Sequence, residues 1–244
     1  MTKRLFSKKQ RKLILSILII PLVSTMASAE TRWKITPGAD LVSSYVWRGV
    51  YQTGASVQPS LTLSHEGGLG LVIWGSTDLA TAGQSGLGIA KEFDFTLSYT
   101  IGSLGLSLTD YWWAGEGQRY GAYSASHFIE GSIAYSFGQL VLSCNTMLRE
   151  GDGGDKDYKQ LYSTYIQGDY NFNFRNVSCT LSAGLIPLTS IYHRTKTAGL
   201  TFSTISLTAT KKLRISNTFS LPVFTRAIVA PNQDNVYLVF GINL

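Results

Sequence analysis

The sequence predicts an all-β protein: a transmembrane antiparallel up-and-down β-barrel of about 12 strands that follows a cleaved signal peptide. Three observations lead to this fold class. Short segments alternate apolar and polar residues up to the end of the chain, their number is even, and the links between them alternate between polar loops and tight turns. Lipid-facing and lumen-facing side chains alternate in this way along the strands of outer-membrane barrels.

The first 29 residues have the pattern of a signal peptide, which leaves 30–244 as a single outer-membrane barrel domain. A basic start is followed by the apolar run from Leu13 to Val23 and by the small residues Ala27-Ser28-Ala29. The apolar run is shorter than the ~20 residues that a membrane-spanning helix needs. Cleavage removes six of the 21 basic residues and none of the 15 acidic ones, so the mature chain is neutral and gives no reason to expect nucleic acid as a partner.

The alternating segments predict strands at 40–48, 56–65, 69–79, 91–101, 104–113, 126–137, 140–149, 159–173, 177–190, 204–215, 218–229 and 235–244. Tight turns are expected at 66–68, 102–103, 138–139, 174–176 and 216–217, and longer loops at 49–55, 80–90, 114–125, 150–158, 191–203 and 230–234. Outer-membrane barrels keep short turns on the periplasmic side, so both termini are expected in the periplasm.

Residue parity along each strand predicts which side chains face lipid. The apolar face is expected to comprise Leu61, Leu63, Leu104, Leu106, Leu108, Ile133, Tyr135, Phe137, Ile205, Leu207, Val236, Leu238, Phe240 and Ile242. The opposite parity carries Ser107, Thr109, Ser132, Ser136, Ser206 and Thr208, which we expect in the lumen. Cys144 and Cys179 share the lipid parity on strands that are not adjacent, so no disulfide is expected between them.

The segment Ser43–Thr53 (SSYVWRGVYQT), followed by Gln58-Pro59 and Trp74-Gly75-Ser76, resembles the N-terminal half of the TorF-type porins. With 111–117 (YWWAGEG) and 219–224 (FSLPVF), the mature chain also resembles a group of outer-membrane barrels of Gram-negative bacteria. This resemblance implies an outer-membrane location after export through the inner membrane, and insertion by the barrel-assembly machinery. The chain departs from the usual assembly signal because it ends in Leu244 rather than in an aromatic residue.

A search for catalytic patterns predicts no enzymatic site. The chain has three histidines; His65 and His193 fall in a turn and a loop, where solvated or interfacial roles are expected. His127 has Ser126 and Glu130 on its strand, but both side chains project to the face opposite His127, which argues against a catalytic relay. We therefore expect no catalytic residue, no metal ligand and no cofactor.

The loop from Glu150 to Asp157 is acidic, and two interpretations stay open for it. In the first, the loop binds calcium or bridges lipopolysaccharide through divalent cations. In the second, it is simply a hydrated outer loop. Its acids lack the regular spacing of an EF-hand and Lys156 dilutes their charge, so the hydrated loop is favoured.

Parity places seven charged side chains in the lumen as candidate eyelet residues: Arg48, Asp78, Glu92, Asp94, Glu130, Asp169 and Arg226. The two arginines fall on the first and eleventh strands, on one arc of a closed ring, while four of the acids fall on strands three to six. Either these charges pair across a plugged interior, or they create a transverse field across an open eyelet. Asp110 has the lipid parity and is expected at the interface or beyond a bulge.

A barrel of eight strands is filled by its own side chains and one of sixteen holds a water-filled channel, so about twelve strands lie between these limits. The longest predicted loop, 191–203, has 13 residues and is too short for a plug domain. The sequence thus favours a narrow passive porin for small hydrophilic solutes, with outer-membrane lipid and lipopolysaccharide as its surroundings. The alternatives are a non-conducting structural or surface-interaction barrel and, less favoured, a barrel-embedded enzyme.

Overall fold

The computed structural model describes residues 32–79, 91–114, 119–150, 159–190, 192–195 and 199–244. The chain divides into two units, Met1–Arg32 and Trp33–Leu244, and the second unit contains all the strands described below. The signal peptide predicted for residues 1–29 lies outside the described residues.

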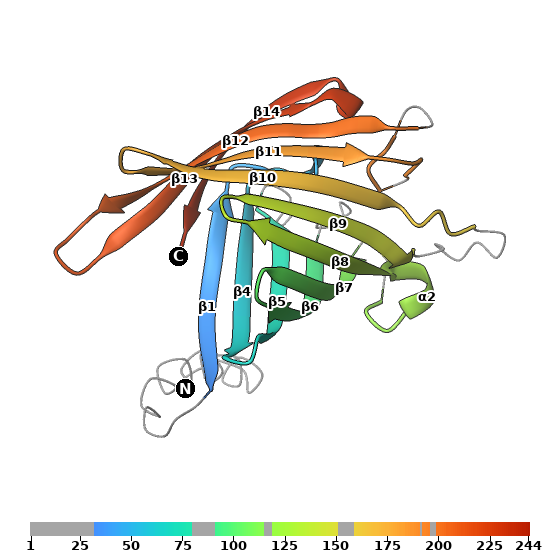
Figure 1. Ribbon diagram of the computed structural model, residues 1–244, viewed down its shortest axis with the longest axis horizontal. Helices are drawn as coiled ribbons and strands as arrows, with labels where there is room; N and C mark the ends of the chain where they lie inside the picture. The colour runs from blue at the N-terminus through green and yellow to red at the C-terminus, as the bar shows by residue number, and fades with distance from the viewer. Residues whose placement is uncertain (1–31, 80–90, 115–118, 151–158, 191, 196–198) are drawn as a thin grey trace, which may run out of the picture. The chain divides into compact units, whose positions relative to one another are not determined.

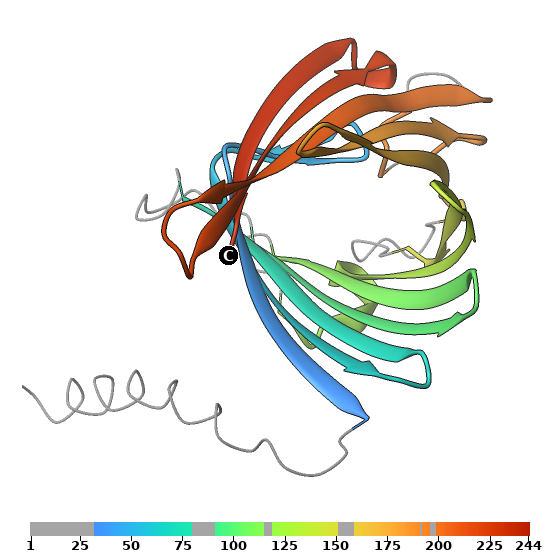
Figure 2. The same cartoon turned by 60° about the vertical axis from the view of Figure 1, so that its left-hand side comes forward.

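Twelve antiparallel strands form a closed barrel, as the alternation predicts (Figures 1 and 2). Each strand of the ring pairs with the next ring strand along the chain, and the last one, β14, pairs with the first, β1. The strands of the ring are β1 (Trp33–Val42), β4 (Ser56–His65), β5 (Leu69–Asp78), β6 (Lys91–Ile101), β7 (Leu104–Ala114), β8 (His127–Phe137), β9 (Leu140–Arg149), β10 (Thr164–Phe174), β11 (Val177–Ile186), β12 (Thr201–Arg214), β13 (Ser220–Ala230) and β14 (Asn235–Asn243).

The links lie alternately at the two ends of the barrel, and most of the longer links lie at the same end. Five short links, between β4 and β5, β6 and β7, β8 and β9, β10 and β11, and β12 and β13, define the short-turn end. Gly102 and Gly138 have positive φ angles of 58° and 64°, which suits the two-residue turns that they begin. The other links define the long-loop end; they contain helix α2 (Tyr123–Ser126) and the short helix η2 (Pro231–Gln233), and Figure 1 shows α2 at the end away from the short turns.

The first strand differs from its prediction at 40–48, because β1 covers 33–42. Pro37 and Gly38 disfavour the interior of a sheet, yet both lie in β1. The pairing explains this placement: β4 pairs with all of β1, whereas β14 pairs only with Asp40–Val42. Pro37 therefore lies where β1 has a partner on one side only. We call the short β1–β14 contact the closure seam.

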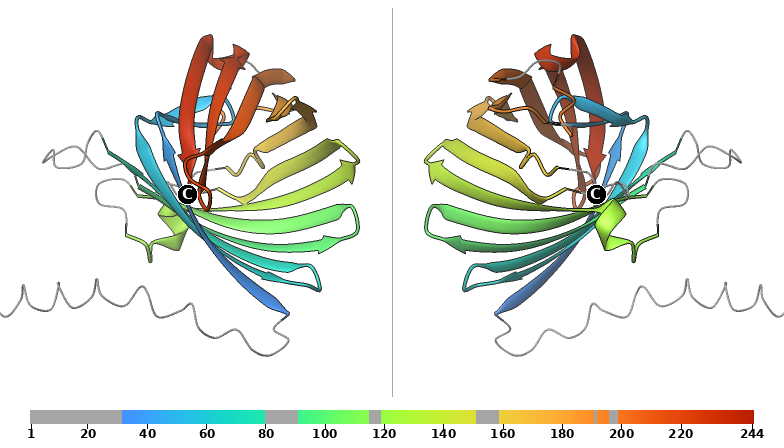
Figure 3. Two further views of the ribbon diagram at one scale, coloured as in Figure 1. Left: turned by 90° about the vertical axis from the view of Figure 1, so that its left-hand side faces the viewer. Right: turned by 90° about the vertical axis from the view of Figure 1, so that its right-hand side faces the viewer.

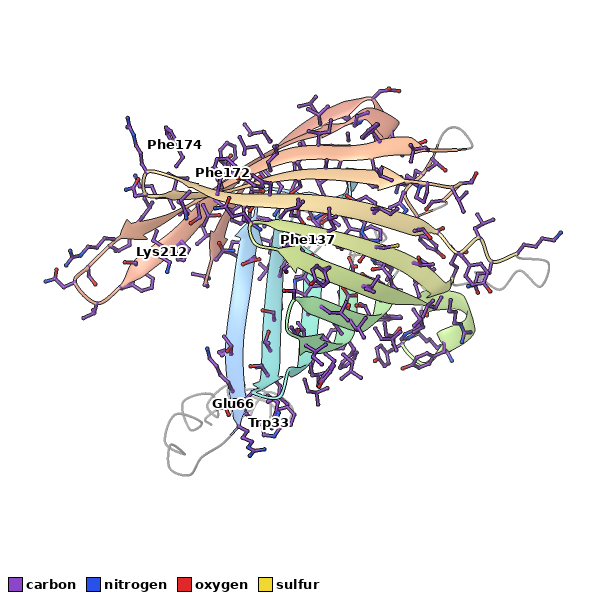
Figure 4. All side chains as sticks on the ribbon, in the orientation of Figure 1. Trp33, Glu66, Phe137, Phe172, Phe174 and Lys212 are labelled. Atoms are coloured by element: carbon purple, nitrogen blue, oxygen red, sulfur yellow. The ribbon has the colours of Figure 1, made fainter. Side chains whose placement is uncertain are left out.

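Apolar side chains cover the outside of the ring. Among the residues predicted to face outward, Leu61, Leu106, Leu108, Ile133, Leu207 and Leu238 are between 43% and 58% exposed, whereas Thr109 and Ser206 on the opposite parity are buried. Figure 4 shows Trp33, Phe137, Phe172 and Phe174 near the short-turn end, where amphipathic and aromatic side chains commonly mark a membrane interface. Cys144 and Cys179 are both free. Within the described ranges, no helix has the length and hydrophobicity that crossing a membrane requires.

Candidate functional site in the lumen

The link between β1 and β4 forms a small hairpin that is separate from the ring. Strands β2 (Tyr45–Trp47) and β3 (Val50–Thr53) pair as a two-stranded sheet. Arg48 and Gly49 at its tip have φ angles of 49° and 83°, the pair of positive values that a tight two-residue hairpin turn requires. The prediction of a barrel strand up to Arg48 and a loop over 49–55 was therefore wrong. The alternation in this segment is real, but it belongs to a hairpin. We call it the inner hairpin.

The inner hairpin packs against the wall formed by β12, β13 and β14. Val46 contacts Ile228 and Val239 in a buried apolar cluster, and Val50 on the other strand is 1% exposed. At the tip, the Ser203 hydroxyl donates a hydrogen bond of 2.6 Å to the carbonyl oxygen of Arg48. In Figure 3 this light-blue segment lies beside the orange and red strands. The hairpin is thus fixed along its length and at its tip.

Arg48 crosses the lumen from the tip to the opposite wall. Its guanidinium donates two hydrogen bonds to Glu130 on β8, of 2.6 Å and 2.8 Å, and it lies 4.5 Å from the centre of the Trp47 ring and 4.6 Å from that of Tyr165. The Tyr111 hydroxyl donates to the same carboxylate at 3.0 Å. Because Glu130 is 1% exposed, this is a buried ion pair joined by two hydrogen bonds, and the Tyr111 hydroxyl adds a third hydrogen bond to the carboxylate.

His193 joins this layer from the loop between β11 and β12. Its ring stacks between Trp47 and Tyr165 at centroid distances of 5.4 Å and 5.3 Å, and Ser190 Oγ lies 2.7 Å from its Nδ1. Burial and the positive charge of Arg48 lower the pKa of His193 from 6.5 to about 3, so the ring is neutral at physiological pH. The prediction of a solvated or interfacial role for His193 was wrong: the side chain is buried. We call Arg48, Glu130, Trp47, Tyr165 and His193 the closed layer.

A cavity of about 380 Å³ adjoins the closed layer. Arg226 on β13 and Asp169 on β10 line it, together with the hairpin residues Val46, Arg48 and Gly49. The rest of its wall is mainly polar and comprises Tyr165, Gln167, Asn171, Thr180, Ser182, Thr204, Ser206, Thr208, Val141 and Ile228. Polar side chains therefore face an internal space inside a barrel whose outer surface is apolar.

The remaining predicted lumen acids lie on the other side of the ring. Asp78 on β5 and Glu92 and Asp94 on β6 are all buried, at 6% to 8% exposure. Within the described part of the chain, Glu92 Oε1 and Asp94 Oδ1 have no hydrogen-bond partner. The structure therefore brings Arg48 to Glu130, places Arg226 with Asp169 around one cavity, and leaves these three acids on a separate arc.

The sequence predicts that the two arginines lie on one arc of the ring and four of the acids on another, and the structure differs from this prediction at Arg48. Arg226 lies on the wall as expected, but Arg48 is carried across the lumen by a hairpin that the alternation did not distinguish from a barrel strand. The signal that could have identified it is Arg48-Gly49 between two short apolar segments, which is compatible with a two-residue hairpin turn.

The outward face of β7 and β8 carries a contact that sequence reasoning missed. Asp110 lies on the lipid parity with no irregularity in β7, and its Oδ1 is 2.8 Å from His127 Nδ1. The other ring nitrogen of His127 is 2.6 Å from the carbonyl oxygen of Tyr120, and Ser126 donates to the carbonyl of Ala122. Ser126, His127 and Glu130 are therefore not brought together.

Most of the predicted acidic loop lies outside the described residues, because these resume at 159. Glu150 at its start accepts hydrogen bonds from the backbone N–H groups of Leu161 and Ser163, at 2.7 Å and 2.9 Å. In the ranges that the structure describes, no group of three or more His, Cys, Asp or Glu side chains is arranged to hold a metal ion.

A family model described as a bacterial protein of unknown function (Gcw_chp) matches residues 26–221. No curated protein matches the chain. Among solved structures, a KdgM porin has a TM-score of 0.44 at 6% identity, covering 86% of this chain and 96% of that one. A double mutant of the Rh. blastica porin has a TM-score of 0.38 at 12% identity, covering 86% and 72%. Both similarities are distant, and the fold assignment rests on the closed strand order itself. The TorF-type resemblance stays a prediction.

Proposed function

This chain belongs to the Gcw_chp family of bacterial proteins of unknown function, and we propose that it is an outer-membrane barrel that acts as a narrow passive porin for small hydrophilic solutes. One observation carries the proposal: a polar cavity lies inside a closed barrel whose outer surface is apolar. A soluble barrel would have the reverse distribution, with apolar side chains inside and polar ones outside.

The outer surface supports the membrane part of this proposal. In the closed ring, most of each strand has a partner on both sides, although the first half of β1 and the first residues of β13 have a partner on one side only. Such pairing is the requirement for strands in a hydrocarbon environment. The long loops at one end and short turns at the other match the asymmetry of outer-membrane barrels. Outer-membrane lipid and lipopolysaccharide are then the expected surroundings, and the short-turn end faces the periplasm.

The inner hairpin is the reason for proposing that the pore is narrow. It occupies part of a lumen that twelve strands would otherwise leave open, and the cavity beside it is within the usual size range of small-molecule sites, roughly 300–1,000 Å³. Passage of a solute therefore requires either a path beside the closed layer or its temporary opening.

A non-conducting structural barrel is the second candidate, and the Arg48–Glu130 contact is the observation that favours it. A buried ion pair held by two hydrogen bonds, and flanked by aromatic rings, would close the lumen permanently in such a barrel. The two candidates differ in one measurable property, the conductance of the refolded protein.

Single-channel recording in planar bilayers tests the proposal. We expect small, stable conductance steps from the wild type. We expect larger steps when residues 45–53 are replaced by a Gly-Ser linker of equal length, because this removes the inner hairpin and keeps the ring. Resistance of the folded barrel to denaturation by detergent at room temperature is the control for insertion. If the wild type is folded and silent, the porin proposal is wrong.

A further inference from the structure

We infer that the cavity between β10 and β13 binds a small zwitterion, with its carboxylate on Arg226 and its ammonium group on Asp169. The inference rests on the proposed function and names the class of solute. It depends on two opposite charges that face one cavity without contacting each other.

Arg226 is oriented with part of its hydrogen-bonding capacity unused. Its Nε donates a hydrogen bond of 3.0 Å to Thr208 Oγ1, and its guanidinium carbon lies 5.8 Å from the centre of the Phe224 ring. Among the described residues, its two terminal nitrogens have no hydrogen-bond partner. A guanidinium fixed through Nε presents these nitrogens as a planar fork, which is the geometry that binds a carboxylate through two parallel hydrogen bonds.

Asp169 is held in place by a chain of polar side chains along the inner face of β10. The Tyr165 hydroxyl donates to Gln167 Oε1 at 3.0 Å, and Gln167 Nε2 donates to both carboxylate oxygens of Asp169, at 2.9 Å and 2.8 Å. An ionised carboxylate has about four acceptor positions, so Asp169 can accept further hydrogen bonds from a bound group. Tyr165 also belongs to the closed layer, so this chain connects the cavity to the inner hairpin.

The strand register puts the two charges in adjacent rows of the wall. Asn171 pairs with Thr180, Thr180 with Thr208, and Thr208 with Arg226; the next row runs from Asp169 to Ser182 and Ser206. Asp169 and Arg226 are therefore three strands apart, about 14 Å along a wall with strands about 4.8 Å apart. Hydroxyl side chains lie between them. The carboxylates of Asp169 and Asp40 act electrostatically on Arg226, yet no ion pair within the described residues joins Arg226 to Asp169.

The charge balance of the cavity selects a zwitterion over a simple ion. Glu130 already neutralises Arg48, so the charges left to a solute are those of Arg226 and the nearby acids. A lone carboxylate bound at Arg226 would also meet the field of Asp169, and a lone ammonium group bound at Asp169 would meet that of Arg226. A molecule with both charges, separated by several bonds, satisfies both side chains at once. Amino acids with a distant amino group and short peptides have this form.

Binding to the refolded, detergent-solubilised full barrel tests the inference independently of conductance. The probes are glycylglycine and γ-aminobutyrate as zwitterions, and butyrate and butylamine as single-charge controls, measured by calorimetry. We expect the zwitterions to bind at least tenfold more tightly than either control. Arg214→Gln and Glu66→Gln, at exposed positions of the short-turn end, should leave this preference unchanged.

Two variants of the cavity should change its preference from zwitterions to probes with a single charge. Asp169→Asn should weaken zwitterion binding and strengthen butyrate binding, because the repelling carboxylate is gone. Arg226→Gln should likewise weaken zwitterion binding and strengthen binding of butylamine. A merely unfolded variant would bind none of the probes and would not gain affinity for a new one, so a gain in affinity supports the assignment.

Two results would overturn the inference: equal affinity of the wild type for glycylglycine and butyrate, or no zwitterion binding by a folded barrel. The proposed function fails separately. A wild type that conducts but does not bind zwitterions keeps the porin proposal and rejects this inference, whereas one that binds them but is silent in bilayers keeps the binding site and rejects the porin.

Discussion

The lumen contains two pairs of opposite charges with different arrangements. Arg48 and Glu130 in the closed layer touch at 2.6 Å and are buried under aromatic rings. Arg226 and Asp169 line the neighbouring cavity and do not form an ion pair. The same pair of charged groups therefore forms a closed contact in one place and lines an open polar cavity in the other. The difference lies in the backbone: the inner hairpin carries Arg48 across the lumen to its partner, whereas Arg226 and Asp169 stay on walls three strands apart.

The largest effect is expected when one partner of the closed pair is removed. Glu130→Gln should lower the free energy of unfolding by about 3–5 kcal/mol, because Arg48 is left buried without a counter-charge. Denaturant titration of the refolded barrel measures this change. Asp169→Asn in the cavity is the matched variant and should cost less than ~1 kcal/mol, as expected for a partly buried charge without an ion-pair partner. Similar losses in both variants would show that the two regions do not differ in this way.

The closed layer should also weaken in acid. The pKa of His193 falls from 6.5 to about 3 on folding, so below pH 6.5 the unfolded chain binds a proton that the folded barrel does not. This contribution to stability is complete above pH 6.5 and is lost as the pH falls toward 3, by about 1.4 kcal/mol per pH unit. Unfolding midpoints measured between pH 7 and pH 4 should show the loss. In His193→Gln the dependence should be reduced by that amount; an unchanged dependence would contradict the burial of this ring.

Gly49→Ala tests how the hairpin tip holds the closed layer. Gly49 has a φ of 83°, and a Cβ there would lie 2.5 Å from the carbonyl oxygen of Ser203. The strained backbone and the contact should cost about 1–3 kcal/mol and increase conductance. Gly102→Ala is the control, since Gly102 also has a positive φ but no atom within 4 Å of an added Cβ. If Gly102→Ala costs as much and Gly49→Ala leaves conductance unchanged, the tip does not anchor the seal.

The smallest expected effect is a change in ion selectivity. Arg226→Gln should shift the reversal potential toward cations, because the cavity then presents carboxylates without an opposing charge. Replacing Arg48 and Glu130 together by Gln should shift it less, since that pair is already neutral. The reversal potential in a salt gradient measures both changes, and a larger shift from the double variant would place the selective charges in the closed layer instead.

The sequence alone predicts most strands and turns of the ring, because the residue patterns that indicate them lie within single short segments. Alternation in segments such as Leu104–Leu108 indicates both the strand and its orientation, and Gly102 and Gly138 mark turns directly. The first strand was misplaced because Pro37 and Gly38 are acceptable only where a strand lacks a partner on one side, and the sequence does not show that β14 pairs with just three residues of β1.

The site was harder to predict because its contacts are long-range. Parity assigned Glu130, Asp169 and Arg226 to inward positions, but no local pattern indicates that Arg48 meets a residue 82 positions away. The burial of His193 depends on the inner hairpin and on β10, and the contact between Asp110 and His127 depends on the β7–β8 register. Such placements follow from the closed ring rather than from any short segment.

The closure seam has a consequence for how the protein is assembled. The last residues of the chain pair with Asp40–Val42, and directly beyond them the backbone N–H of Ser43 donates to the carbonyl of Phe240 at 2.8 Å. The ring is thus joined at the base of the inner hairpin, and the hairpin packs on β12 to β14, the last three strands of the ring. We therefore expect closure of the wall and filling of the lumen to occur as one late, cooperative step, limited by the long-range pairing of β1 with β14. An intermediate released before that step would have an open wall between β1 and β14, and its inner hairpin would not yet be packed in the lumen.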